Sequence, residues 1–235
     1  MGHEIDRLRG VLFDVFGTCV DWRSGVIRAG EALGLRGVDW PGLADAWRGA
    51  YQPQLETVRS GERPWTVLDV LHREALDALL GDFGLEALGE AERETLTRAW
   101  HRLDPWPDVV QGLERLKRRY VVAPCSNGHI ALVLNMAKRA RLPWDVILGA
   151  EVARAYKPDP EAYLRSAAAA GLAPEEVMMV ATHAGDLVAA ARCGLRTAFV
   201  PRPAEHGPDG VAETPPEGVD IVAADFLALA RVLGA

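Results

Sequence analysis

Short apolar runs typical of β-strands alternate with amphipathic helical patterns over most of the chain, and this alternation constrains the fold more than any other feature. The runs lie at residues 11–13, 120–123, 146–148, 177–181, 197–200 and 220–222. Strands separated by helices pair in parallel, because a parallel connection must cross from one end of the sheet to the other. The sequence therefore predicts an α/β fold built on a doubly wound parallel sheet.

The strand pattern stops after the first run and resumes only beyond residue 105. Three helical patterns, interrupted by proline and glycine, occupy residues 43–58, 65–80 and 91–103. Five of the seven tryptophans also lie in this part of the chain, and we expect most of them to pack in a core. We predict a helical insert at residues 21–104, with the α/β core formed by residues 1–20 and 105–235.

Charge and composition exclude several classes of partner. The formal net charge of -7 argues against nucleic acid or an anionic membrane surface, since both favour basic patches. No unbroken apolar stretch of about 18 residues is present, and residues 1–10 lack the apolar core of a signal peptide. The three cysteines lack metal-ligand spacing and are predicted to be free thiols. We expect a cytoplasmic protein. The proline- and glycine-rich loop 201–218 is expected to be flexible.

Polar side chains gather where the predicted strands end. They are Asp14 and Thr18 after the first strand, Ser126 and Asn127 after the second, Lys157 after the third, and His183 and Asp186 after the fourth. Ligands of open parallel sheets bind at the carboxyl ends of the strands. Alone, Asp14 would be interpreted as a turn residue. Together these side chains predict an active site at one edge of the sheet.

Four of these segments carry a family resemblance. FDVFGT (residues 13–18), CSNG (125–128), YKPDP (156–160) and the late Asp186 resemble the four motifs of the haloacid dehalogenase superfamily. The helical insert resembles the cap domain of that superfamily. The resemblance extends over nearly the whole chain and implies a Rossmann-like core with a helical cap inserted after the first strand.

Most members of the superfamily are magnesium-dependent phosphotransferases, so a phosphatase is the first alternative. Those enzymes use a second aspartate two residues after the nucleophile, where this chain has Phe16. Magnesium also needs several oxygen ligands, yet Asp186 is followed by Leu187 and Ala190. The chain therefore resembles the metal-free branch, the 2-haloacid dehalogenases, and we expect no metal and no cofactor in catalysis.

The resemblance implies a role for each group of the predicted site. Asp14 is the nucleophile that displaces halide from C2 of the substrate and forms an ester. Asp186 holds or activates the water that hydrolyses this ester, and Lys157 neutralises the two carboxylates. Thr18 and Ser126 orient these groups by hydrogen bonds.

Other residues match the substrate side of the family's site. Arg48, in the segment DAWRGAY, corresponds to the arginine that binds the substrate carboxylate and the departing halide, although alone it would be interpreted as a solvated helix residue. Asn127 corresponds to a halide-side amide, Tyr163 to a supporting phenol, and Phe16 to an aromatic residue of the pocket. His183 is included as a site residue without an assigned role.

Two positions depart from the family pattern. Gly185 stands where the family often has an aromatic residue, and Ala181 stands at a frequent serine position. A glycine there enlarges the pocket, which leaves the halogen and the chain length of the substrate open. We expect a small anionic substrate, a 2-haloacid, and we consider a homodimer, with the oligomeric state left open. Three interpretations remain: a dehalogenase of short 2-haloalkanoic acids, a phosphatase or other hydrolase that acts through Asp14, and a non-catalytic protein that binds an anion or a partner.

Overall fold

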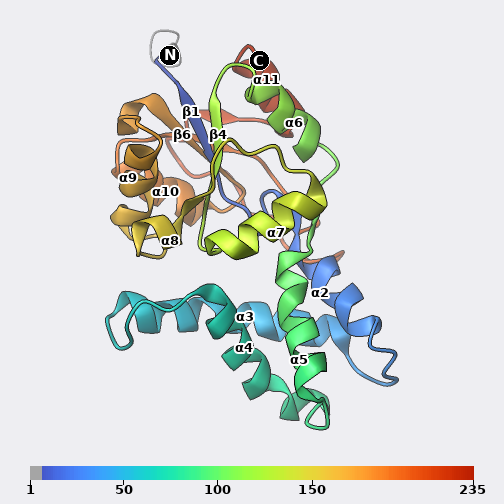
Figure 1. Cartoon of the computed structure of the whole chain (residues 1–235). Helices are drawn as coiled ribbons and strands as arrows, with labels where there is room; N and C mark the ends of the chain where they lie inside the picture. The colour runs from blue at the N-terminus through green and yellow to red at the C-terminus, as the bar shows by residue number, and fades with distance from the viewer. Residues whose placement is uncertain (1–6) are drawn as a thin grey trace.

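The computed structural model describes residues 7–235, so most of the stretch 1–10 considered above lies outside the described residues. Six parallel strands form the central sheet in the order β5-β4-β1-β6-β7-β8 (Figure 1). The strands are β1 (Gly10–Phe13), β4 (Val121–Ser126), β5 (Leu148–Gly149), β6 (Val177–Ala181), β7 (Arg196–Phe199) and β8 (Ile221–Val222). The predicted α/β fold is therefore confirmed. After β1 the chain forms β4 and β5 on one side of β1, and it then crosses over to form β6, which pairs with the other side of β1. The topological switch point therefore lies at β1.

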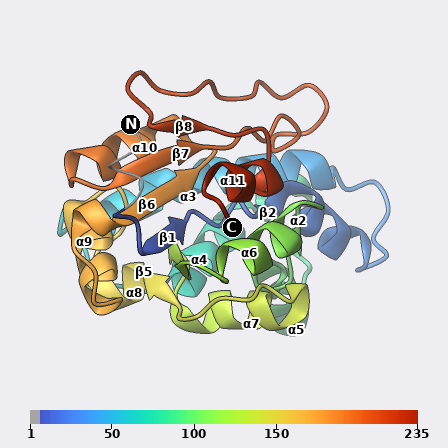
Figure 2. The ribbon, with the colours of Figure 1, turned by 90° about the horizontal axis from the view of Figure 1, so that it is seen from above.

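Helices cover both faces of this sheet (Figure 2). One face carries α6 (Val109–Leu116), α7 (Ile130–Ala140) and α11 (Phe226–Val232), and the other carries α8 (Ala150–Ala153), α9 (Pro160–Ala169) and α10 (Ala184–Arg192). A short 3₁₀ turn, η3 (Pro174–Glu176), precedes β6. Successive side chains of a strand point to opposite faces. Val11 and Phe13 accordingly belong to one hydrophobic cluster, and Leu12 belongs to the other.

A separate group of helices lies beyond the carboxyl edge of the sheet (Figure 1). We call it the helical insert: α2 (Trp22–Glu31), α3 (Trp40–Arg59), α4 (Leu68–Leu79), η1 (Gly81–Phe83), α5 (Glu90–Thr97) and η2 (Arg98–His101). The pattern at residues 91–103 is thus divided between α5 and η2. Trp22, Trp47 and Trp100 are each 1% exposed and pack together, as expected for a hydrophobic core.

The two ends of the helical insert are joined by a small antiparallel strand pair. In it β2 (Val20–Asp21) pairs with β3 (Asp104–Pro105), and Asp21 lies opposite Asp104. The pair was not predicted, because two residues are too few to show a strand pattern. The predicted insert boundaries, residues 21 and 104, face each other across it.

None of the helices within residues 7–235 is long and apolar enough to cross a membrane. Cys19, Cys125 and Cys193 are free thiols, as the sequence predicts.

Candidate active site

Asp14 continues directly from the end of β1 at the switch point of the sheet. Its backbone N–H donates to Val180 O of β6 at 3.0 Å, which extends the parallel ladder by one residue. The chain then turns sharply through Gly17, at φ 85°, a left-handed conformation that glycine adopts without steric cost. This turn returns Thr18 to Asp14, where the Thr18 hydroxyl donates to Asp14 Oδ2 at 2.7 Å.

Lys157 bridges the two buried carboxylates of the site. Its ammonium donates to Asp14 Oδ1 at 2.8 Å and to Asp186 Oδ2. Burial opposes the charge of Lys157, but the two carboxylates outweigh it and raise the lysine pKa. Burial alone would raise the pKa of Asp14, yet Lys157 and His183 hold it well below its ordinary value. Asp14 is therefore ionised at neutral pH.

Asp186 differs from Asp14 in the balance of the same forces. Burial raises the pKa of Asp186 above its ordinary value, and the favourable charge of Lys157 only partly offsets it. The Tyr163 hydroxyl donates to Asp186 Oδ1 at 2.6 Å. Two buried carboxylates with pKa values displaced in opposite directions can divide a reaction between a nucleophile and a base.

His183 lies between Asp14 and Glu205, and Glu205 was missed by the sequence analysis. The ring nitrogens Nδ1 and Nε2 lie 3.0 Å from Asp14 Oδ2 and 3.0 Å from Glu205 Oε1. Burial lowers the pKa of His183, but the two carboxylates outweigh it and raise the pKa to about 10. His183 is therefore an imidazolium at neutral pH, which donates from both nitrogens.

Glu205 belongs to the loop 201–218, which was expected to be flexible. That expectation is wrong for the start of the loop, where Arg202 and Glu205 are buried. Arg202 donates to Thr18 O at 2.8 Å and forms a double hydrogen bond with Asp108. The Glu205 carboxylate accepts from Trp22 Nε1 at 3.1 Å and packs over Gly17. A lone acidic residue in such a loop carries no sequence signal that would have identified it.

A pocket of about 390 Å³ opens between this edge of the sheet and the helical insert. Asp14, Lys157 and Asp186 line it together with Phe16, and Arg48 enters from α3. The guanidinium of Arg48 lies 4.5 Å from the ring centre of Tyr51 and 5.4 Å from that of Trp22. Its Nη1 is buried and has no hydrogen-bond partner among the described residues. A guanidinium with a buried donor that lacks a partner is a ready site for an anion.

The remaining predicted residues have different surroundings. Asn127 lines the pocket, and its Oδ1 accepts from the backbone N–H of Lys157 at 2.8 Å. The hydroxyl oxygen of Ser126 accepts from Gly128 N at 3.0 Å, so it braces the loop after β4 rather than contacting Asp14. Gly185 lines the pocket, and a Cβ added there would meet no atom within 4 Å.

The residues present do not fit a catalytic magnesium ion. Magnesium requires several oxygen ligands in octahedral array. Here the ammonium of Lys157 stands between the two carboxylates, and the residue two positions after Asp14 is the aromatic Phe16 rather than a further oxygen ligand. The positive charge that balances Asp14 is supplied by Lys157 and His183 instead.

Taken together, the parallel sheet, the helical insert over its carboxyl edge and the buried pair of carboxylates are the features of an enzyme with an α/β core and a helical cap over its site. The model of the haloacid dehalogenase-like hydrolases matches residues 8–194, and the chain belongs to this family.

Known dehalogenases resemble the chain over most of its length. (S)-2-haloacid dehalogenase 4A of Burkholderia cepacia is 32% identical over 203 residues, which cover 84% of this chain and 85% of that protein. The solved structure of a defluorinating L-2-haloacid dehalogenase is 48% identical, with a TM-score of 0.94 and coverage of 97% and 96% of the two chains. The L-2-haloacid dehalogenase from Xanthobacter autotrophicus, with chloropropionic acid covalently bound, is 25% identical, with a TM-score of 0.81 and coverage of 97% and 99%.

Proposed function

We propose that this protein hydrolyses the carbon–halogen bond of short (S)-2-haloalkanoic acids and releases 2-hydroxy acids through an ester on Asp14. One observation carries the proposal: an ionised, buried Asp14 and a half-buried Arg48 guanidinium, whose buried Nη1 has no hydrogen-bond partner among the described residues, line the same pocket. The first is a nucleophile for carbon, and the second is an anchor for the substrate carboxylate. The names of the relatives support the same reaction.

The two oxygens of Asp14 have different partners, and this difference assigns their roles. Oδ2 accepts from both Thr18 and His183, whereas Oδ1 accepts from Lys157. Oδ1 therefore keeps more of its lone-pair capacity and attacks C2 of the substrate. The new O–C2 bond forms as the C2–halogen bond breaks, and the halide leaves with the bonding electrons and inverts C2.

The second step returns the enzyme to its starting state. Water attacks Cγ of the Asp14 ester and gives its proton to Asp186, whose raised pKa suits a base. Negative charge then develops on Oδ2, where the Thr18 hydroxyl and the His183 Nδ1–H already point. These two donors serve as an oxyanion hole. Collapse of the intermediate releases the hydroxy acid, which takes its proton from Asp186 and carries an oxygen of Asp14. The second proton of the water then leaves the Asp14 carboxyl for solvent, so both carboxylates return to their starting state.

A single turnover in heavy-oxygen water tests this proposal. Enzyme is used in excess over (S)-2-chloropropionate. The new hydroxyl group on C2 of the product should contain light oxygen, and mass spectrometry should find one heavy oxygen on the Asp14 peptide. Asp14→Asn is the control and should release no halide. Heavy oxygen in the first-turnover product, with none on Asp14, would show direct attack by water and would reject the ester.

A substrate screen distinguishes the alternative functions. Halide release is measured for chloro-, bromo- and fluoroacids beside a generic phosphate ester, with and without chelator. The fluoroacids are included because a solved relative is described as defluorinating. Turnover of the phosphate ester alone would favour a phosphatase, and no turnover of any compound would favour an anion-binding protein.

We also propose a cytoplasmic location, which the three free thiols support, since thiols persist in reducing compartments. The homodimer and the lack of a nucleic-acid partner stay predictions.

A further inference from the structure

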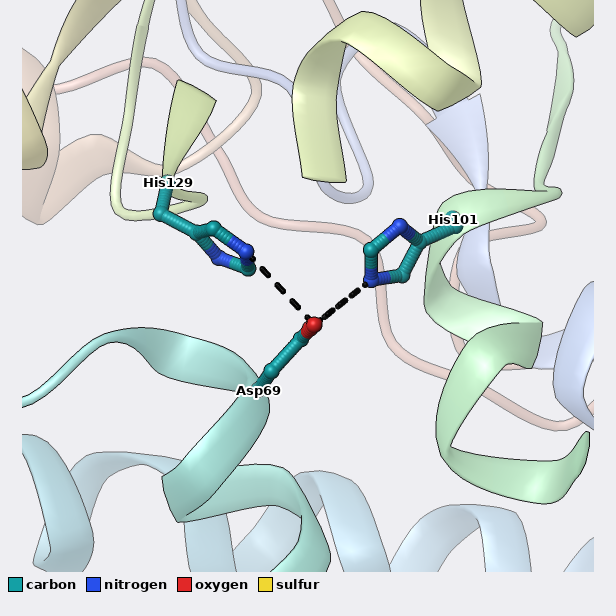
Figure 3. A group of neighbouring side chains, drawn as sticks. All are labelled: Asp69, His101 and His129. Atoms are coloured by element: carbon teal, nitrogen blue, oxygen red, sulfur yellow. Dashed lines mark hydrogen bonds and ion pairs between the residues drawn. The ribbon is translucent and has the colours of Figure 1, made fainter. Parts of the chain in front are cut away.

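A second cluster of titratable side chains lies outside the pocket of Asp14. Asp69, His101 and His129 bring one carboxylate oxygen and two imidazole nitrogens within 4.8 Å of one another (Figure 3). Asp69 lies on α4 and His101 on η2, so both come from the helical insert, whereas His129 follows β4 in the core. None of the three lines the catalytic pocket. The proposed reaction uses none of them.

We propose that Asp69, His101 and His129 bind a zinc ion that fastens the helical insert to the α/β core. Two imidazoles and a carboxylate form a ligand set that zinc commonly takes. Bonds of about 2.0–2.1 Å in a tetrahedral site separate neighbouring ligand atoms by roughly 3.3 Å. His101 Nε2 lies 2.8 Å from Asp69 Oδ1, and His129 Nε2 lies 3.5 Å from Asp69 Oδ2, so small side-chain movements suffice.

The surroundings of the two histidines favour ligation through Nε2. The side-chain nitrogen Nδ2 of Asn135 lies 2.9 Å from His101 Nδ1. A flip of this amide would bring its oxygen to the ring, where it would accept the Nδ1 proton and leave the Nε2 lone pair for a metal, the usual support of a ligating histidine. His129 Nδ1 is buried without a partner among the described residues.

Arg98 occupies the place of a cation beside the cluster. Its Nη1 lies 3.4 Å from Asp69 Oδ2 and 3.4 Å from His101 Nε2. The side chain is 42% exposed and is also held by Glu94, so it can swing outward without leaving a buried charge. Arg98 and His101 also line a cavity of about 450 Å³, which leaves room for a fourth, water ligand beside His101.

The contribution of this ion would be mechanical rather than chemical. It would join two ligands of the helical insert to one ligand of the core, near Asn127 of the catalytic pocket but not in it. Zinc that binds only the folded protein raises its melting temperature by mass action. At free zinc about 100 times the dissociation constant, we expect an increase of about 5–10 °C for a chain of this length.

The test uses the full-length, chelator-treated protein and cobalt as a spectroscopic probe of the zinc site. Cobalt should produce visible d–d absorption that zinc abolishes, and zinc should raise the melting temperature. His129→Asn and Asp69→Asn should lose both effects, while His206→Asn, which changes an exposed histidine outside the cluster, should retain them. All proteins carry His3→Asn, so that a histidine near the start of the chain adds no background.

Two further measurements keep the test decisive. Far-UV circular dichroism shows whether each variant is folded, and Asp69→Asn preserves the side-chain shape if His129→Asn does not fold. Arg98→Gln removes the competing charge and should tighten cobalt binding at least threefold. Absence of the cobalt spectrum in the parent protein, or its persistence in folded Asp69→Asn and His129→Asn, would overturn the proposal. The positions of the heavy oxygen after a single turnover should be the same whether or not zinc binds. The zinc proposal and the ester proposal can therefore fail independently.

Discussion

Replacement of Arg48 by lysine tests the substrate anchor most directly. Lysine keeps the positive charge but loses the planar fork of donors that fits a carboxylate. In the structure the guanidinium is held between the rings of Tyr51 and Trp22, with Nη1 buried and unpaired. We expect Arg48→Lys to reduce kcat/KM strongly, with much of the loss in KM, because the carboxylate is bound both before and during the reaction.

The size of the loss follows from these contacts. One charge-assisted hydrogen bond contributes about 1.5–3 kcal/mol. The cation–π contacts with the two rings contribute about 0.5–1 kcal/mol more, of which lysine recovers little in this geometry. A total of about 2–4 kcal/mol corresponds to a decrease in kcat/KM of roughly 30- to 1,000-fold.

The assay is halide release from (S)-2-chloropropionate over a range of concentrations. Arg59→Lys is the matched control: Arg59 lies on the same helix and lines the same pocket, but Glu56 and Asp159 already pair with it. Its effect should be within about threefold of the parent, as for a partly exposed ion pair. Unchanged kinetics in Arg48→Lys, or an equal loss in Arg59→Lys, would refute the assignment of Arg48 as the anchor.

Three other predictions concern the metal, the histidine and the open side of the pocket. Chelator should leave kcat unchanged, because Lys157 rather than a metal balances the carboxylates; loss of activity that magnesium restores would contradict this. The pKa of His183 is raised from 6.5 to about 10, so the stability that its charge contributes is full below pH 6.5 and lost as the pH rises through about 10. Glu205→Gln removes one of the two carboxylates that raise this pKa, so NMR titration should find a lower pKa for His183. The loss of stability with rising pH should then begin at a lower pH. Identical titrations of the variant and the parent would contradict the assignment. Gly185→Phe should leave the melting temperature within about 2 °C of the parent value, since a Cβ at this position meets open space. The variant should lose more turnover of long-chain 2-haloacids than of chloroacetate. Equal losses on both substrates would show that Gly185 does not set the pocket size.

The sheet could be predicted from the sequence because its strands are buried on both sides. Such strands appear as continuous apolar runs, and β1, β4 and β6 lie within a few residues of their predicted places. The third run was placed at residues 146–148, whereas β5 is Leu148–Gly149. Val146 is apolar but 39% exposed, so hydrophobicity alone placed the start of this strand too early.

The catalytic groups could be predicted in part, because strand order places them at one edge. Asp14, Lys157 and Asp186 meet there as the four motifs imply. Glu205 could not be predicted, because it reaches His183 from a loop whose path depends on tertiary packing. The Asp69 cluster was missed for a similar reason. Its first two members are 32 positions apart and share no metal-binding spacing, so only the folding of the insert against the core brings them together.

The strand pair β2–β3 brings together the two points at which the chain enters and leaves the helical insert. Because Asp21 lies opposite Asp104, the core meets this long excursion at a stem only two residues wide on each side. An exchange of helices at this stem would leave the order of the strands in the sheet unchanged, although contacts such as that of Trp22 with Glu205 would have to be rebuilt. Arg48 belongs to the helical insert, whereas Asp14 belongs to the core. We therefore expect that exchange of the insert would change the group that binds the substrate anion and would leave the nucleophile in place.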